Sequence, residues 1–374
     1  MPPTDKPQRY PGECDETHPE KFTVVPKQPT EKKPGQLPQH MIDQFFKEGY
    51  VVVDKFFDCE KDLDPCREAI KDLVDGLANK LYKGGKIKQL YDEYGLFERL
   101  THIEIEFPGA NILLHKAGQL PQPLKNLWTN ERLLNVVEQL IGPEISGHPV
   151  WNLRTKTPQN EATTVPWHQD CAYLDNRAYN VLQPTAWIPL LNATEQNGCM
   201  RVAAGGHKLG KVAQHQCCHG GTWYVMLEEE EMKKTLGVDL EKDIKCCPIP
   251  YGGMLLLNNM IPHHSLPNMS KEIRWSLDFR WQQTGFSPGF YDMKETIPMR
   301  TAKKPDFKMD WSDFDGVDRH VIAAEQIKEE GQKGQDEYDI TIQGPWMKKW
   351  ELIHMNHHTD RLLDEQTNTT WHKA

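Results

Sequence analysis

The segment Ile273–Trp281, with the sequence IRWSLDFRW, alternates strictly between apolar residues at odd positions and polar residues at even positions. Because successive side chains of a strand point to opposite faces, this pattern predicts a strand whose apolar face is buried. A polar face in plain solvent would usually carry Lys and Glu, whereas this one carries Arg274 and Ser276. A guanidinium offers a fork of donors and a hydroxyl adds another, so this face predicts a clamp for a carboxylate.

A second motif, WHQD, holds His168 and Asp170 two residues apart. If this segment is a strand, both side chains point to the same face and can reach one metal ion. A later Pro-His-His-Ser motif offers a third ligand, either His263 or His264. Adjacent strand residues face opposite ways, so only one of these histidines can join the site, and spacing alone leaves both open. Two histidines and a carboxylate form the facial triad of non-heme Fe(II) oxygenases. Together with the carboxylate clamp, this ligand set predicts Fe(II) and 2-oxoglutarate.

Three motifs of the chain are specific when taken together. They are His168-Gln169-Asp170, the run Asn197–Val202 leading to Gly205-Gly206-His207, and the run Pro262–Asn268 leading to Arg274. Over roughly Leu37 to Gln282, the chain resembles the phytanoyl-CoA dioxygenase (PhyH-like) family of 2-oxoglutarate-dependent oxygenases. In the family pattern the distal histidine directly follows the proline and the arginine stands 11 residues later, as His263 and Arg274 do here. The resemblance therefore selects His263 over His264.

The resemblance implies a mainly β fold with flanking helices, the cupin-like jelly roll or double-stranded β-helix. Short strands separated by Gly, Pro and Asn turns after residue 165 agree with this fold. The expected metal ligands are His168, Asp170 and His263, and the expected cofactor-binding residues are Arg274, Ser265, Ser276, Trp187 and Lys116. Candidates to face the substrate are Tyr173 and Arg280, together with Asp278 and Gln282.

These residues predict an Fe(II)- and 2-oxoglutarate-dependent dioxygenase that uses O2 to hydroxylate a C–H bond of a small molecule. Succinate and CO2 are the expected co-products, and ascorbate is a candidate reductant. Related halogenases bind halide in place of the carboxylate ligand, so the presence of Asp170 favours hydroxylation. One alternative is a catalytically silent sensor or scaffold that binds iron and 2-oxoglutarate. Another is a zinc-dependent isomerase or hydrolase, in which Arg274 would have no evident role.

Composition restricts the class of protein but does not identify it. The chain has 374 residues and a net charge of -10, which argues against a general nucleic-acid or anionic-membrane binder. The N-terminus lacks the layout of a secretory signal and the C-terminus lacks a Ser-Lys-Leu address, so we expect a cytoplasmic protein. The nine cysteines are then expected to be reduced thiols. A zinc site between the segment 215–219 and the pair Cys246-Cys247 is disfavoured, because adjacent cysteines fit zinc poorly.

The predicted organisation is a flexible N-terminal arm over residues 1–37, an oxygenase domain over 38–284, and a C-terminal extension over 285–374 packed on the domain. For the extension, a flap over the active site and a dimer contact remain alternatives. Helices are predicted over residues 41–46, 60–81 and 130–141, the last capped by Thr129, and within the acidic insert 227–245. Further strands are predicted over residues 50–53, 103–114, 145–155, 168–174, 184–191, 200–202 and 246–249.

Overall fold

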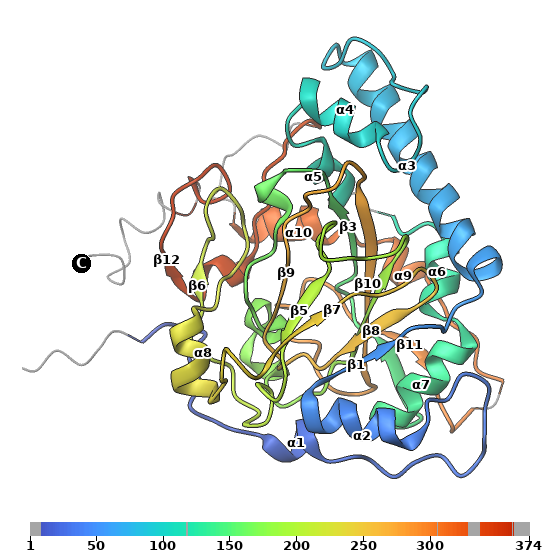
Figure 1. Ribbon diagram of the computed structural model, residues 1–374, viewed down its shortest axis with the longest axis vertical. Coiled ribbons are helices and arrows are strands. Elements are labelled where there is room, and N and C mark those ends of the chain that lie inside the picture. Colours follow the sequence, from blue (N-terminus) through green and yellow to red (C-terminus); the bar gives the residue numbers. More distant parts are fainter. Residues whose placement is uncertain (1–8, 117–118, 305, 328–336, 361, 363–374) are drawn as a thin grey trace, which may run out of the picture.

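Two antiparallel sheets form the centre of the protein (Figure 1). The computed structural model describes residues 9–116, 119–304, 306–327, 337–360 and 362. The larger sheet has the strand order β1 (Tyr50–Val53), β8 (Met254–Leu257), β4 (Thr185–Pro189), β10 (Arg274–Gln283), β2 (Ile145–Gly147) and β11 (Ile297–Arg300), with β3 (Asn152–Lys156) also paired to β10. The smaller sheet has the order β7 (Ile244–Cys247), β5 (Met200–Ala203) and β9 (His263–Ser265). Residues of both sheets line one internal cavity, and this arrangement confirms the predicted double-stranded β-helix.

Strand β10 runs through the middle of the larger sheet and has the alternation that its sequence predicts. The apolar side chains from Trp275 to Trp281 at odd positions are fully buried in the main hydrophobic cluster. The polar side chains from Arg274 to Arg280 at even positions are also buried, because the smaller sheet covers that face. The polar face of β10 therefore borders a cavity between the two sheets and not bulk solvent.

Helices cover the outer, apolar face of the larger sheet. Those with side chains in the main cluster behind β10 are α2 (Gln39–Glu48), α3 (Asp64–Lys83), α4 (Arg99–Glu106), α5 (Ala110–His115), α6 (Gln122–Trp128), α7 (Glu131–Ile141) and α9 (Ser312–Asp315), of which α3 and α7 contribute most. Helices α1 (Pro19–Thr23), α8 (Glu229–Leu236) and α10 (Arg319–Ile327) bury their apolar side chains in other clusters. The ring of Trp128 in α6 stacks on the ring of Phe279 in β10, with 5.3 Å between their centroids. This contact holds the helical layer on the sheet.

Shorter elements complete the chain. A π-helical turn covers Cys59–Leu63, and 3-10 turns cover Glu161–Thr163, Asp170–Tyr173, Asn176–Ala178 and Pro345–Lys348. Strands β6 (Gln216–Cys217) and β12 (Glu351–Leu352) pair in parallel apart from the two main sheets.

The helix predicted over residues 60–81 is present as the π-helical turn and α3, and the helix predicted over 130–141 is present as α7. The cap of α7 is Asn130 and not Thr129: the Asn130 side chain accepts hydrogen bonds from the backbone N–H groups of Arg132 and Leu133. Thr129 instead donates its hydroxyl to the Lys125 carbonyl in the preceding helix.

Two predicted strands are wrong. Residues 103–114 form parts of α4 and α5, separated by Gly109, whose φ of 98° lies in the left-handed region. A short apolar run is ambiguous between strand and helix, and here packing against α3 selects the helix. Residues 168–174 form one bridge at His168 and then a 3-10 turn, in which the Ala172 N–H donates to the Gln169 carbonyl. The acidic insert contains a shorter helix than expected, α8, followed by β7.

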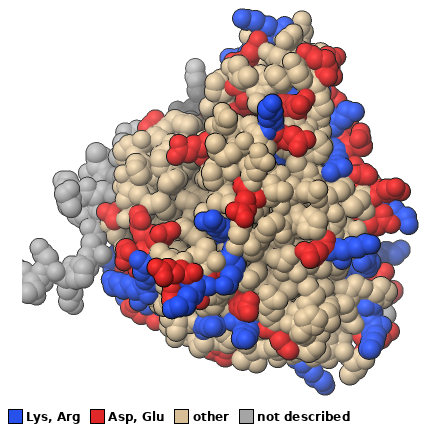
Figure 2. All heavy atoms as spheres, viewed as in Figure 1, with Lys and Arg blue, Asp and Glu red and all other residues tan. Residues whose placement is uncertain are grey.

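The predicted terminal regions lie partly outside the described residues. Of the arm, residues 9–37 are docked: Phe22 is fully buried and the Gln28 amide donates to the Gln139 carbonyl. The described part of the extension packs on the domain through Trp350 and Met347. Acidic and basic side chains are interspersed on the face shown in Figure 2. Among the described residues, every helix is too short or too polar to span a membrane.

Replacing Phe279 with Ala should lower the free energy of unfolding by about 3–5 kcal/mol, because it leaves a cavity against Trp128. Replacing the 73% exposed Ile105 with Ala should change it by less than about 0.5 kcal/mol. Urea denaturation followed by tryptophan fluorescence measures both. Equal effects of the two substitutions would contradict the assignment of Phe279 to the core.

Candidate metal centre

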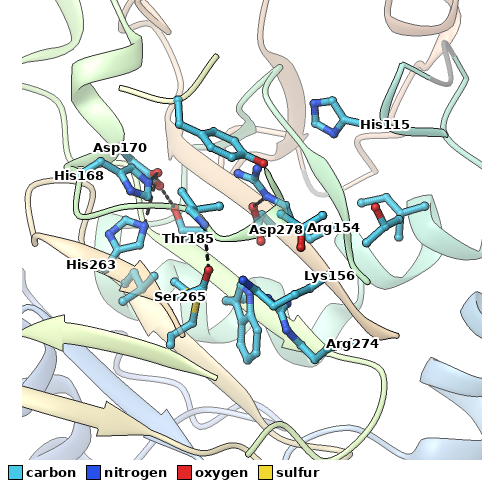
Figure 3. Close-up of a pocket in the computed structure, with 18 of the residues that line it drawn as sticks. His115, Arg154, Lys156, His168, Asp170, Thr185, His263, Ser265, Arg274 and Asp278 are labelled. Carbon is cyan, nitrogen blue, oxygen red and sulfur yellow. Dashed lines mark hydrogen bonds and ion pairs between the residues drawn. The ribbon is translucent and has the colours of Figure 1, made fainter. Parts of the chain in front are cut away.

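The backbone brings His168 and His263 side by side. Each residue donates its backbone N–H to the carbonyl of the other, at 3.0 Å in both directions, and so closes an isolated antiparallel bridge at the edge of β9. The imidazole centroids lie 4.2 Å apart. This bridge places both rings on the same side, facing the cavity between the sheets (Figure 3).

Both imidazoles are oriented by their own backbone. The Nδ1 of His168 lies 2.9 Å from the Pro166 carbonyl, and the Nδ1 of His263 lies 3.0 Å from the Ile261 carbonyl. A carbonyl can only accept, so each Nδ1 carries the hydrogen and each Nε2 keeps its lone pair. Burial, with a further contribution from His168, lowers the pKa of His263 to about 4, so this ring is neutral near pH 7. A neutral imidazole is the form that binds metal.

Asp170 completes the group of metal-ligating atoms. Its Oδ1 lies 3.5 Å from Nε2 of His168 and 3.7 Å from Nε2 of His263, and the three ligand atoms lie within 4.8 Å of one another. The three side chains are 3%, 8% and 4% exposed in sequence order. Two neutral nitrogens and one carboxylate oxygen are the donor set of the facial triad. These residues therefore fit Fe(II).

The second carboxylate oxygen of Asp170 is held by the larger sheet. Its Oδ2 accepts from Nε and Nη2 of Arg280, at 3.0 and 2.9 Å, and from the Thr185 hydroxyl at 3.2 Å. Burial raises the pKa of Asp170, but the Arg280 guanidinium and the imidazoles outweigh it and hold this pKa well below its usual range. Arg280, expected to face the substrate, thus orients the carboxylate of an expected metal ligand, and sequence reasoning missed this contact.

Arg274 lies in the same cavity as the three ligands (Figure 3). It is 3% exposed, and its Nη1 donates to the Ser276 hydroxyl at 2.5 Å. Its guanidinium lies 5.1 Å from the ring centroid of Trp187, while its Nε has no hydrogen-bond partner and it forms no ion pair among the described residues. Burial lowers the pKa of Arg274 to about 10, so it remains charged. A buried guanidinium without a carboxylate is suited to an anionic ligand.

The expected basic neighbour, Lys116, does not line this cavity. Its ammonium donates to the carbonyls of Asp339 and Thr341 in the C-terminal extension. Lys156 lies in the cavity instead, directly opposite Arg274 in the pairing of β3 with β10. Lys156 stands two residues after Arg154, so both side chains point to the same face of β3. This spacing is the sequence signal that could have identified Lys156.

The remaining expected residues divide between the cavity and its surroundings. Ser265 lines the cavity, and its hydroxyl accepts from the Val165 backbone N–H. Tyr173 lies in an adjoining cavity, where its hydroxyl accepts from the Val225 N–H. His264 lies outside both cavities and packs on Trp167, with 4.1 Å between ring centroids. Asp278 lines the first cavity and pairs with Arg154, whereas Gln282 lines neither and donates to the Phe286 carbonyl.

The cysteines and His215 form no second metal cluster among the described residues. His215 accepts from the Gln169 backbone N–H at Nε2 and so supports the loop between the metal ligands. Cys217 and Cys218, expected to be reduced thiols, are joined in a disulfide, and the other seven cysteines are free. The prediction of reduced thiols came from the expected cellular compartment. It did not consider that the thiols of two adjacent cysteines could bond to each other.

The motifs and their geometry agree with a comparison to known proteins. The model of the family "Phytanoyl-CoA dioxygenase (PhyH)" matches residues 45–276, more than half of the chain. The chain belongs to the phytanoyl-CoA dioxygenase family. The resemblance predicted from the sequence is thereby confirmed.

Two curated relatives and two solved structures are similar to this member of the family. The 1-deoxypentalenic acid 11-beta-hydroxylase of Streptomyces arenae is 28% identical over 173 residues, and that of Streptomyces exfoliatus is 28% identical over 181 residues. Each match covers 44% of this chain. The chain spans 59% of the length of these relatives. The non-heme monooxygenase ThoJ aligns at 18% identity and a TM-score of 0.47 over 73% of this chain and 90% of its own. EctD from S. alaskensis, with 2-oxoglutarate and 5-hydroxyectoine, aligns at 16% identity and a TM-score of 0.45 over 79% and 89%.

Replacing His168 with Ala should weaken Fe(II) binding more than about 100-fold, beyond the 10–100-fold loss typical of an outer-shell partner. Replacing His264 with Ala should leave Fe(II) affinity unchanged, since this ring packs on Trp167. Anaerobic competition against a chromophoric chelator measures both affinities. A loss in the His264 variant equal to that in the His168 variant would contradict the selection of ligands.

Proposed function

We propose that this protein is an Fe(II)- and 2-oxoglutarate-dependent dioxygenase that hydroxylates a C–H bond of a small molecule, with succinate and CO2 as co-products. One observation carries the proposal: the cavity that holds His168, Asp170 and His263 also holds the buried Arg274, which has no carboxylate partner among the described residues. A hydrolase or isomerase that uses only a metal would not need this cation. A catalytically silent scaffold would retain it, but no ligand or clamp residue is missing here.

In the proposed reaction, Nε2 of His168, Nε2 of His263 and Oδ1 of Asp170 would hold the iron. Bound iron supplies the activation of dioxygen, with 2-oxoglutarate as the source of two electrons. Arg280 and Thr185 occupy the other oxygen of Asp170, so that this carboxylate offers a single oxygen to the metal. The presence of Asp170 supports hydroxylation, and the names of the curated relatives, which are hydroxylases, support it too.

The carboxylate of 2-oxoglutarate remote from the metal is proposed to bind Arg274. Ser276 fixes the guanidinium from the same face of β10, and Trp187 supports it by stacking. Lys156 is proposed as a second cation for this carboxylate, because it is almost fully buried and the only described hydrogen bond of its ammonium group is to the Thr164 hydroxyl at 3.3 Å. Burial, followed by repulsion from Arg274 and Arg154, lowers the pKa of Lys156 well below its usual range, and an anion would reverse this effect.

We further propose that the substrate is a small molecule and not a nucleic acid, and that the protein acts in the cytoplasm. The net charge of -10 supports the first proposal. Seven of the nine cysteines are free, which supports the second proposal, since thiols persist in a reducing compartment; the Cys217–Cys218 disulfide is the exception.

Replacing Arg274 with Ala should weaken 2-oxoglutarate binding at least about 30-fold and leave Fe(II) affinity unchanged, because truncating one partner of a buried charge pair costs about 2–5 kcal/mol. The metal-to-ligand charge-transfer band formed anaerobically with Fe(II) and 2-oxoglutarate measures the affinity. Arg300→Ala is the matched control, since Arg300 pairs with Glu138 away from the cavity. An undiminished band in the Arg274 variant, or no band in the unmodified protein, would overturn the proposed function.

Replacing Lys156 with Met should weaken 2-oxoglutarate binding by about 3- to 10-fold, as expected when a charge-assisted hydrogen bond is lost beside a retained arginine. Lys116→Met is the control, because its ammonium lies on backbone carbonyls of the extension. The same titration measures both variants. A larger loss in the Lys116 variant would restore the sequence-based assignment and exclude Lys156.

A further inference from the structure

A second cavity adjoins the one that holds the proposed metal site. The two share Asp170, Arg154 and Arg280, so the metal ligand Asp170 borders both. Most of the second cavity's wall is apolar: its members include Val150, Leu174, Phe290, Met293, Ala323 and Ile342. Four of these six residues follow residue 284 and belong to the C-terminal extension. The extension therefore forms part of a chamber beside the metal site.

The arginines of the two cavities outnumber the carboxylates available to pair with them. Arg154 pairs with Asp278 at 2.9 Å, and Arg280 pairs with Asp170 at 2.9 Å. Arg274 is assigned above to 2-oxoglutarate. Arg319, at the start of α10, lines the second cavity and forms no ion pair with any residue that the structure describes.

Arg319 is held in place but not neutralised. It is 9% exposed, its Nη2 donates to the Trp151 carbonyl at 2.7 Å, and its guanidinium lies 5.4 Å from the Trp151 ring centroid. The neighbouring Asp318 uses its carboxylate to accept from the backbone N–H groups of His320 and Val321. Burial, with repulsion from Arg280 and Arg154, outweighs the smaller opposing effect of Asp318 and lowers the pKa of Arg319 to about 10, so it is still a cation near pH 7. Burying such a cation without a counter-ion is unfavourable, and a bound anion would remove the penalty.

A second polar group in this cavity lacks a partner. The Nε2 of His320 is buried and makes no hydrogen bond with the described residues. His320 directly follows Arg319 in α10. The centroid of its ring lies 5.7 Å from that of His115, which borders both cavities. The chamber thus combines an apolar wall with one unpaired cation and one unfilled hydrogen-bonding position.

We infer that the substrate is an apolar molecule bearing a carboxylate, and that Arg319 of the C-terminal extension binds this carboxylate while the apolar body fills the chamber beside Asp170. The inference rests on the proposed function for the reaction, but the binding site itself does not require turnover. One guanidinium offers a planar fork that matches a carboxylate. A phosphate ester, with a further oxygen and up to two charges, would leave part of its charge unpaired beside a single arginine. Hydroxylation would then occur on the part of the body that lies nearest the metal.

The test compares two probes of the same shape, 1-adamantanecarboxylate and the neutral 1-adamantanemethanol. Their Kd values are measured by quenching of tryptophan fluorescence, since Trp223 and Trp346 line the chamber. Titrations are run on metal-free protein, and again anaerobically with Fe(II) and 2-oxoglutarate. The unmodified protein should bind the acid at least about tenfold more tightly than the alcohol in both states.

Variants of Arg319 assign the preference to this residue. Arg319→Gln removes the charge but keeps a donor for the Trp151 carbonyl, and it should abolish the preference for the acid. Arg319→Lys should retain most of the preference, and it also keeps the test valid if the Gln variant fails to fold. Arg177→Gln is the matched control, because Arg177 is half exposed and pairs with Asp175 and Asp292 at the surface.

Equal binding of the two probes by the unmodified protein, or an undiminished preference in Arg319→Gln, would overturn the inference. Competition by inorganic phosphate as strong as that by the acid would also overturn it in favour of a phosphate ester. The charge-transfer band with 2-oxoglutarate separates this inference from the proposed function. A band with no preference for the acid refutes the inference alone, whereas a preference without a band refutes the proposed function alone.

Discussion

The reciprocal backbone hydrogen bonds between His168 and His263 are the constraint on which the proposed site depends. They join segments that are remote in sequence, and they set the positions of both imidazoles before any metal binds. Gln169, between the two ligands of the first motif, strengthens the junction by donating its amide to the Met260 carbonyl and accepting from the Ala213 N–H. Each ring then bonds to a carbonyl of its own segment, so its Nε2 faces the cavity. Such preorganisation lowers the entropic cost of ordering these side chains when a metal binds.

Charge balance in the interior is the second organising feature. Even-numbered positions of β10 and β3 place several buried ionic groups on one enclosed face, where an unpaired charge is far less stable than in water. Asp170 and Asp278 each neutralise one arginine. Each of the two cavities, which share Arg154 and Arg280 in their walls, also contains a buried cation without a carboxylate partner among the described residues. These cations mark where anionic molecules are expected, one molecule in each cavity. The distribution of unpaired charge thus carries information about ligands that the metal-ligating residues alone do not.

The sequence predicted the double-stranded β-helix, the alternation of β10 and the convergence of His168, Asp170 and His263. These features depend on local periodicity and on short motifs, which a single sequence displays directly. Lys116 does not line the cavity as expected, and the contact of Arg280 with Asp170 was not foreseen, for a different reason. Each side chain is placed by its partner from a remote segment, Asp170 for Arg280 and the extension for Lys116. The strand predicted over residues 103–114 failed because tertiary packing decided between two local conformations of similar propensity.

The two cavities draw on different parts of the chain, because only the second includes described residues of the C-terminal extension. The three proposed metal ligands lie within residues 45–276, the part that matches the family, whereas Phe290, Met293 and Arg319 lie beyond it. Changes in the later segment could alter part of the chamber's wall and its unpaired charge without altering any of the three proposed metal ligands. Chemistry and choice of substrate can therefore diverge at different rates within one gene.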